Sequence, residues 1–111
     1  MAEEYRRKAP RRDYDGQVGT LFHGKLTITQ CAQLGEGGAL IHSKPELENI
    51  EKGDQIVLTL FLLNIGGLIA PAQCVYRAPD GKIGLQFLSL DTVYKKHIRE
   101  FVSRRKTFEV V

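Results

Sequence analysis

Apolar and polar residues alternate along most of the chain and change period near its end. In TLFHGKLTITQCAQL (20–34), Leu26 and Ile28 fall on one parity and Thr27 and Thr29 on the other. This period of two predicts a half-buried strand. Further strands are predicted at ALIH (39–42), QIVLTLFLLN (55–64), LIAPAQCVYR (68–77) and KIGLQF (82–87).

Turn residues separate these segments. We predict turns at DYDGQVG (13–19), GEGG (35–38), Gly53-Asp54, 64–67 and APDG (78–81). The strand at 55–64 is apolar on both parities, which is typical of a central strand covered on both faces. Pro71 in the next strand favours an edge or a bulge, because proline has no backbone N–H for the ladder.

After Asp91 the apolar residues follow helical spacing. Asp91 is a good N-cap residue, and an amphipathic helix is predicted over 91–105. Its apolar positions are Val93, Tyr94, His97, Ile98, Phe101 and Val102. About six short strands followed by one helix indicate a mostly β domain, either a small antiparallel barrel or a sandwich. We divide the chain into a basic arm (1–15), a β-domain with its helix (16–106) and a tail (107–111).

Composition fits one globular domain with an uneven charge. Of 111 residues, 42 % are apolar and 26 % charged, and the net charge is +3. Residues 1–12 carry five of the 16 basic side chains, and residues 95–106 carry six. Basic ends indicate an anionic partner, although they also serve solubility.

Two features bear on the environment of the protein. Cys31 and Cys74 lie in apolar, strand-like segments without metal-ligand spacing, so we expect buried free thiols in a cytoplasmic protein. The uncharged stretch 55–76 is interrupted by Asn64, Gly66-Gly67 and Pro71, and a membrane-spanning helix needs about 20 apolar residues. Two strands fit better than a membrane span.

Catalytic patterns are absent from the sequence. His23, His42 and His97 are scattered, and no known nucleophile, metalloprotease or P-loop motif occurs. We therefore predict a protein that is not an enzyme and needs no cofactor.

The basic arm contains the most informative residues. In EYRRKAPRRD (4–13), Arg7 and Arg11 are four residues apart, and Pro10 biases Ala9 toward an extended conformation. Arginine can bond guanine O6 and N7 together, stack on a base, and pair with phosphate. A mobile arm of this kind suits a guanine nucleotide.

The chain resembles the PilZ domains, bacterial receptors for cyclic di-GMP. The resemblance rests on RRKAPR, on LGEGGALI and on IGLQF followed by a capped helix. It implies a small six-stranded antiparallel β-barrel with a C-terminal α-helix. It also implies that an R-x-x-x-R loop, here Arg7 and Arg11 beside Arg6, closes over a D/N-x-S-x-x-G motif to hold the dinucleotide.

The second motif departs from the family pattern. It aligns with Gln33, Gly35 and Gly38, so glutamine replaces Asp or Asn and glycine replaces Ser. Gln33 offers guanine one neutral acceptor in place of a carboxylate. We estimate that losing both groups costs roughly 2–4.5 kcal/mol of binding free energy, partly offset by the freed backbone N–H of Gly35.

Three functions remain open from the sequence. The first is a cyclic di-GMP receptor that passes a signal to an unidentified protein partner. The second is a degenerate PilZ-like adaptor that acts through protein contacts alone, in motility or pilus control. The third, which we consider unlikely, is a small nucleic-acid-binding barrel that uses both basic ends.

Overall fold

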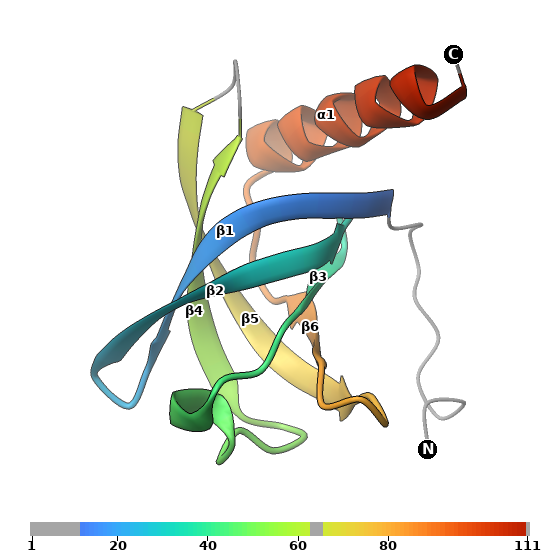
Figure 1. Cartoon of the computed structure of the whole chain (residues 1–111). Helices are drawn as coiled ribbons and strands as arrows, with labels where there is room; N and C mark the ends of the chain where they lie inside the picture. The colour runs from blue at the N-terminus through green and yellow to red at the C-terminus, as the bar shows by residue number, and fades with distance from the viewer. Residues whose placement is uncertain (1–11, 63–65, 111) are drawn as a thin grey trace.

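The structure, a computed structural model, describes residues 12–62 and 66–110 of the chain (Figure 1). A 3₁₀ turn at Pro45–Leu47 lies between the third and fourth strands. The strands and the helix are β1 (Arg12–Phe22), β2 (Lys25–Leu34), β3 (Gly38–Ile41), β4 (Gln55–Leu62), β5 (Gly66–Arg77), β6 (Ile83–Phe87) and α1 (Thr92–Val110).

The six strands in the described residues form one closed antiparallel barrel. Their order around the barrel is β1-β2-β3-β6-β5-β4, and pairing of β1 with β4 closes the ring. Helix α1 lies across one end of the barrel, next to β1 (Figure 1). The predicted six-stranded antiparallel β-barrel with a C-terminal α-helix is therefore confirmed.

The barrel interior is the hydrophobic core. Two threonines are buried in it, and each is satisfied: Thr20 Oγ1 donates to the Thr27 carbonyl at 3.0 Å and Thr29 Oγ1 to the His42 carbonyl at 2.9 Å. The largest fully buried apolar side chains are Val18, Cys31, Leu34, Ile41, Leu47, Ile50, Leu58, Ile83, Leu85 and Ile98.

The first hairpin differs from the sequence prediction. Residues 20–34 are not one strand, because His23 and Gly24 form a two-residue turn with φ of 51° and 78°, and Phe22 pairs with Lys25. Residues 13–19 are not a turn but part of β1. A bulge between Asp13 and Gly16 accommodates the turn-like residues there.

Gly16 is required inside β1 by an aromatic ring. A Cβ at this position would lie 2.4 Å from the Tyr14 hydroxyl oxygen. Gly84 in β6 has the same relationship to Tyr76, whose ring would be 2.3 Å from the added Cβ. Each tyrosine covers a glycine of the barrel wall, which explains glycine in a strand interior.

The two cysteines are buried free thiols, as predicted. Each lies beside a bulge: the register shifts between Cys31 and Gln33 and between Cys74 and Tyr76. The Cys31 Sγ donates to the Gln33 carbonyl at 3.2 Å, and the Cys74 Sγ to the Tyr76 carbonyl at 3.6 Å.

Strand β4 is covered on one face only, so the prediction of cover on both faces is wrong. Ile56, Leu58 and Leu60 are buried in the barrel, whereas Phe61 on the outer face is 69 % exposed. Pro71 lies within β5, between β4 and β6 of the closed barrel, and the bulge of β5 is at Cys74–Tyr76, so the predicted edge or bulge at Pro71 is wrong. The proline is tolerated because its carbonyl accepts from the Leu88 N–H at 2.9 Å just beyond the end of β6, where a missing N–H interrupts no strand pairing.

Helix α1 begins where Asp91 predicts. The Asp91 carboxylate accepts from the Val93 N–H at 2.8 Å, and the helix backbone continues to Val110, beyond the expected end at 105. Ile98 is fully buried and Phe101 meets Tyr14 edge to face at 5.4 Å. Val93 and Tyr94, predicted on the apolar face, are exposed instead. No helix in the described residues is both long and apolar enough to span a membrane.

Candidate functional site

The start of β1, the end of β2 and the start of β3 lie side by side. Arg12 pairs with Leu34 and Asp13 pairs with Gln33, while Gln33 pairs on its other side with Leu40. The basic arm therefore joins the barrel next to the second motif. Arg6, Arg7 and Arg11 themselves lie outside the described residues.

Gln33 lies on the outer surface of the barrel because of the bulge in β2. Residues that face the interior of a regular strand are two or four positions apart, but Cys31 and Leu34 are three apart and both buried. The bulge therefore accommodates one extra residue between them. That residue allows Gln33 to remain half-buried on the outside. The Gln33 side chain is therefore positioned by the bulge, and strand pairing with β1 and β3 holds that bulge in place.

The turn from β2 to β3 is held by backbone hydrogen bonds. The Gly35 N–H donates to the Gly38 carbonyl at 3.0 Å, and the Phe87 N–H donates to the Gly37 carbonyl at 2.9 Å. The expectation that the Gly35 N–H is free for a ligand is therefore wrong. Positive φ angles occur in the described glycines at 24, 53, 66 and 81 only, so the turn at 35–38 forms without them.

Gly35 and Gly38 are both buried in this turn, and Gly38 pairs with Gln86 of β6. The structure thus brings together three of the predicted site residues, namely Gln33, Gly35 and Gly38, on one short segment of the barrel wall.

An ion pair links this turn to helix α1. Arg99 donates from Nε to Glu36 Oε2 at 2.7 Å and from its terminal nitrogen to Oε1 at 3.1 Å. The hydrogen bond from Arg99, with the positive charges of Arg99 and Lys95, lowers the pKa of Glu36 below its ordinary value of 4.5. Glu36 therefore stays ionised at neutral pH, and its charge is compensated where an anionic ligand would approach.

The sequence prediction missed the pair of Glu36 and Arg99. The two residues are 63 positions apart, and no local spacing relates them. The only signal available was that a basic helix and an acidic turn occur in one small domain.

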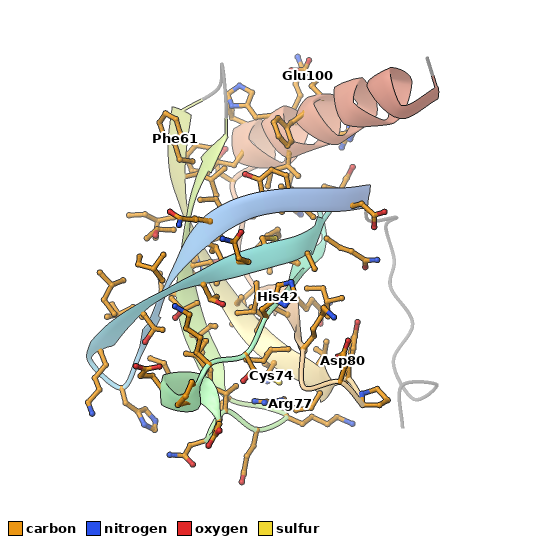
Figure 2. The ribbon with its side chains drawn as sticks, viewed as in Figure 1. His42, Phe61, Cys74, Arg77, Asp80 and Glu100 are labelled. Carbon is orange, nitrogen blue, oxygen red and sulfur yellow. The ribbon has the colours of Figure 1, made fainter. Side chains whose placement is uncertain are left out.

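The rest of the described chain adds no catalytic group of residues. His23 stacks on Phe22 in the first hairpin, His42 follows β3, and His97 is on the helix, so the three belong to separate elements. No cluster of His, Cys, Asp and Glu side chains in the described part could hold a metal ion. Arg77, labelled in Figure 2, lies toward the end of the barrel opposite α1 and bonds the carbonyls of Leu47 and Ile50. It serves the packing of a loop.

Comparison with solved structures identifies the same barrel in known proteins. The chain is similar to the Bacillus subtilis inhibitor of motility MotI/DgrA, with a TM-score of 0.79 and 16 % identity over 93 % of this chain and 52 % of that one. It is similar to the PilZ domain of Escherichia coli YcgR with c-di-GMP, with a TM-score of 0.72 and 13 % identity over 95 % and 96 %. A third is the K. pneumonia MrkH–c-di-GMP complex, with a TM-score of 0.68 and 17 % identity over 96 % and 54 %.

The chain spans about half the length of MotI/DgrA and MrkH, and nearly all of the YcgR domain. At these identities the similarity shows a shared fold. No curated protein matches the chain in sequence. The sequence model of the PilZ domain, however, matches residues 5–104, which include the arginine arm, the β2–β3 turn and most of the helix up to residue 104. The chain therefore belongs to the PilZ domain family.

Proposed function

We propose that this chain is a non-enzymatic signalling protein that binds cyclic di-GMP and passes the signal to a protein partner. The observation that carries the proposal is the pairing of Arg12 with Leu34 and of Asp13 with Gln33. This pairing anchors the end of the arginine arm beside the turn at 35–38. The pairing supports the proposal because the segment that carries Arg7 and Arg11 joins the barrel next to the strand end that carries Gln33.

Each site residue has a role that its chemistry supports. Arg7 and Arg11, with Arg6 beside them, would hold guanine and phosphate from the arm side. Gln33 would accept from or donate to a guanine edge from the barrel side. Gly35 and Gly38 would let the ligand approach the backbone closely, since neither has a side chain.

Similar folds are consistent with this assignment. The YcgR domain and MrkH were both solved with c-di-GMP, and the PilZ model covers Arg6, Arg7 and Arg11 as well as the turn in this chain. The charges near the turn also permit an anion, because Arg99 compensates Glu36 and Lys95 adds positive charge. We infer binding weaker than a complete motif gives, because Gln33 and Gly35 replace an acidic acceptor and a hydroxyl.

A second candidate is a PilZ adaptor that no longer binds the nucleotide. Two observations favour it: the motif lacks its carboxylate at Gln33, and the Gly35 N–H is already bonded to the Gly38 carbonyl. In this case RRKAPRR would be a surface for an acidic protein partner.

A calorimetric titration with cyclic di-GMP tests the receptor proposal. Binding is expected for the native chain and a loss of at least tenfold for Arg7→Ala or Arg11→Ala, which corresponds to about 1.4 kcal/mol each. Lys82→Ala, which removes one positive charge from the β5–β6 turn, is the matched control and should bind normally.

Absence of binding in the folded native chain would contradict the receptor proposal and favour the adaptor. Equal loss in the Lys82→Ala control would mean that general positive charge, and not the arm, attracts the ligand. Random oligonucleotides, titrated at two salt concentrations, test the nucleic-acid alternative, whose affinity would fall steeply with salt.

A further inference from the structure

Four neighbouring strands present a continuous apolar surface to the outside of the barrel. The register aligns outward-facing residues across β2, β1, β4 and β5: Ile28 lies opposite Gly19, Gly19 opposite Thr59, and Thr59 opposite Ile69. A second row aligns Leu26, Leu21, Val57 and Pro71 in the same way. We call the surface made by Leu21, Leu26, Ile28, Val57, Phe61 and Ile69 the outer apolar face.

Large side chains on this face are unusually exposed for their chemistry. Leu26 and Ile69 are each 64 % exposed, and Phe61 is 69 % exposed. Tyr94 of α1, which is 38 % exposed and lines the hollow beside β5, extends the surface. At about 150 Å² per fully exposed large apolar side chain, these residues with Leu21 and Ile28 expose roughly 500 Å².

That area lies in the upper part of the range for an ordinary monomer surface, where the largest apolar patch is about 300–600 Å². It approaches the roughly 800 Å² that each partner contributes to a standard protein interface, and Val57, Thr59 and Pro71 add to it. The outer apolar face thus has the size of an interface.

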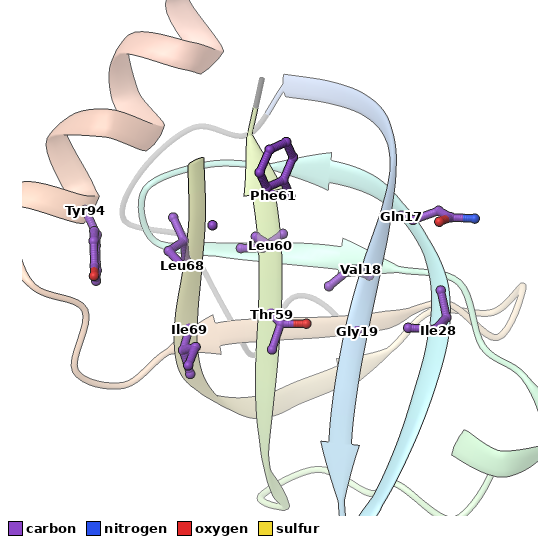
Figure 3. A pocket seen from close by; sticks show the side chains of 11 residues that line it. Gln17, Val18, Gly19, Ile28, Thr59, Leu60, Phe61, Leu68, Ile69 and Tyr94 are labelled. Carbon is purple, nitrogen blue, oxygen red and sulfur yellow. The ribbon is translucent and has the colours of Figure 1, made fainter. Parts of the chain in front are cut away.

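The face carries both a projection and a hollow. A hollow of about 610 Å³ lies between β1, β4, β5 and Tyr94 (Figure 3). Gly19 and Gly67 line it, and a Cβ at Gly19 would lie 2.4 Å from Thr59 Oγ1, so the hollow depends on glycine there. Phe61 lines the same hollow and is largely exposed, so it provides the projecting side chain.

We propose that the outer apolar face binds the same face of a second copy of this chain, forming a twofold symmetric dimer. A symmetric interface must complement itself, and this face offers a projection beside a hollow. The residues that line the hollow include no charged side chain, whereas the chain has a net charge of +3. Two copies can therefore meet here without bringing like charges together, as two sheets packed about 10 Å apart.

The oligomeric state of the full chain tests this proposal without any nucleotide, so it is independent of the proposed function. Analytical ultracentrifugation between about 1 μM and 1 mM should show a monomer–dimer equilibrium. Ile69→Lys should shift the dissociation constant upward at least tenfold, because it places two ammonium groups in an apolar interface. Pro79→Lys adds the same charge at an exposed position in the β5–β6 turn, which contributes no residue to the face, and should leave the dimer intact.

Cross-linking gives a second readout that does not depend on the stability of the lysine variant. In Thr59→Cys the new thiol is the accessible one, since Cys31 and Cys74 are buried. A bifunctional thiol reagent with a reach of about 10 Å, the distance between packed sheets, should join two copies of Thr59→Cys but not of Pro79→Cys.

A monomer over the whole concentration range would overturn the proposal, and the face would then belong to a different protein partner. A dimer that Ile69→Lys leaves unchanged, or that cross-links equally well through Pro79→Cys, would overturn it as well.

Discussion

Arg99 on helix α1 holds Glu36 of the β2–β3 turn through two hydrogen bonds, at 2.7 and 3.1 Å. The pair connects the C-terminal helix to the segment that contains Gly35 and Gly38. A ligand that shifts the turn, or that competes with Glu36 for the guanidinium group, would act on the helix directly. The helix is therefore the element we expect to report on the state of the site.

The contact between helix and turn should depend on acid pH. The folded-state pKa of Glu36 is lowered, so the stabilisation is present above its ordinary value of 4.5 and is lost as the pH falls through the lowered value. Amide exchange across residues 92–101 should accelerate, relative to the barrel strands, once the pH is low enough to protonate Glu36, which requires a pH below its ordinary pKa of 4.5.

Glu36→Gln should show fast helix exchange already at pH 7, because the neutral amide cannot accept as strongly from Arg99. Asp80→Asn is the matched control: the Lys82–Asp80 pair also lowers the pKa of its carboxyl, but it lies in the β5–β6 turn. Unchanged helix exchange in Glu36→Gln would contradict a role for the pair in holding the helix.

Repair of the second motif should strengthen binding of cyclic di-GMP. Gln33→Asp restores a charged acceptor, and a gain of tenfold or more is expected if the bonds are worth over about 1.4 kcal/mol. Because Gln33 faces Asp13 across β1 and β2, repulsion between carboxylates should reduce the gain by roughly 0.2–1 kcal/mol.

Gln30→Asp, which places a carboxylate on the same strand but away from the turn, is the control and should not strengthen binding. Adding Gly35→Ser to Gln33→Asp tests the hydroxyl, and no left-handed backbone opposes it. If neither repaired variant binds while both remain folded, the arm does not hold a nucleotide.

Arg77 should stabilise the barrel at the end opposite the helix. Its guanidinium donates to the carbonyls of Leu47 and Ile50 at 3.1 and 3.0 Å and to Ser43 Oγ at 3.2 Å. Arg77→Lys keeps the positive charge but loses the planar guanidinium group that donates to all three acceptors. It should lower the free energy of unfolding, measured with urea, by about 2 kcal/mol. A cost equal to that of Lys82→Gln, which removes a charge from the β5–β6 turn, would show that these bonds add nothing.

Neither thiol should react in the folded protein. Burial raises the pKa of Cys74, and Cys31 is 1 % exposed, so little thiolate is available to a thiol reagent. Two thiols should be labelled in denaturant and almost none in native buffer over minutes, with Thr59→Cys as the reactive control. Rapid labelling of the native chain would indicate that the barrel opens at its bulges.

The fold was predictable where a structural feature depends on interactions between residues close together in the sequence. Asp91 predicts the helix start because capping is a local interaction with the Val93 N–H. The first hairpin was not predictable in this way, because Gly24 and His23 carry a weaker turn signal than Asn-Gly, and the strand residues on both sides merge into one run.

The site was predictable only in part. Gln33, Gly35 and Gly38 follow from motif spacing, whereas the engaged N–H of Gly35 and the Glu36–Arg99 pair result from tertiary packing. The apolar pattern of β4 was interpreted as cover on both faces, and Phe61 shows that this chain by itself covers only one. The apolar pattern of a strand indicates which of its faces are apolar, but it does not indicate what packs against each face.

Closure of the ring constrains how the chain folds. Strands β1 and β2 form one hairpin with a two-residue turn, and β4 and β5 pair as near neighbours in sequence, so both can form early from local contacts. The seams β1–β4 and β3–β6 join residues about 40 apart in the chain, such as Val18 with Leu60 and Ala39 with Leu85. The entropy cost of closing these long loops slows folding, so we expect folding in milliseconds to seconds, with the two seams formed late. Substitutions at the seams should then speed unfolding more than they slow folding.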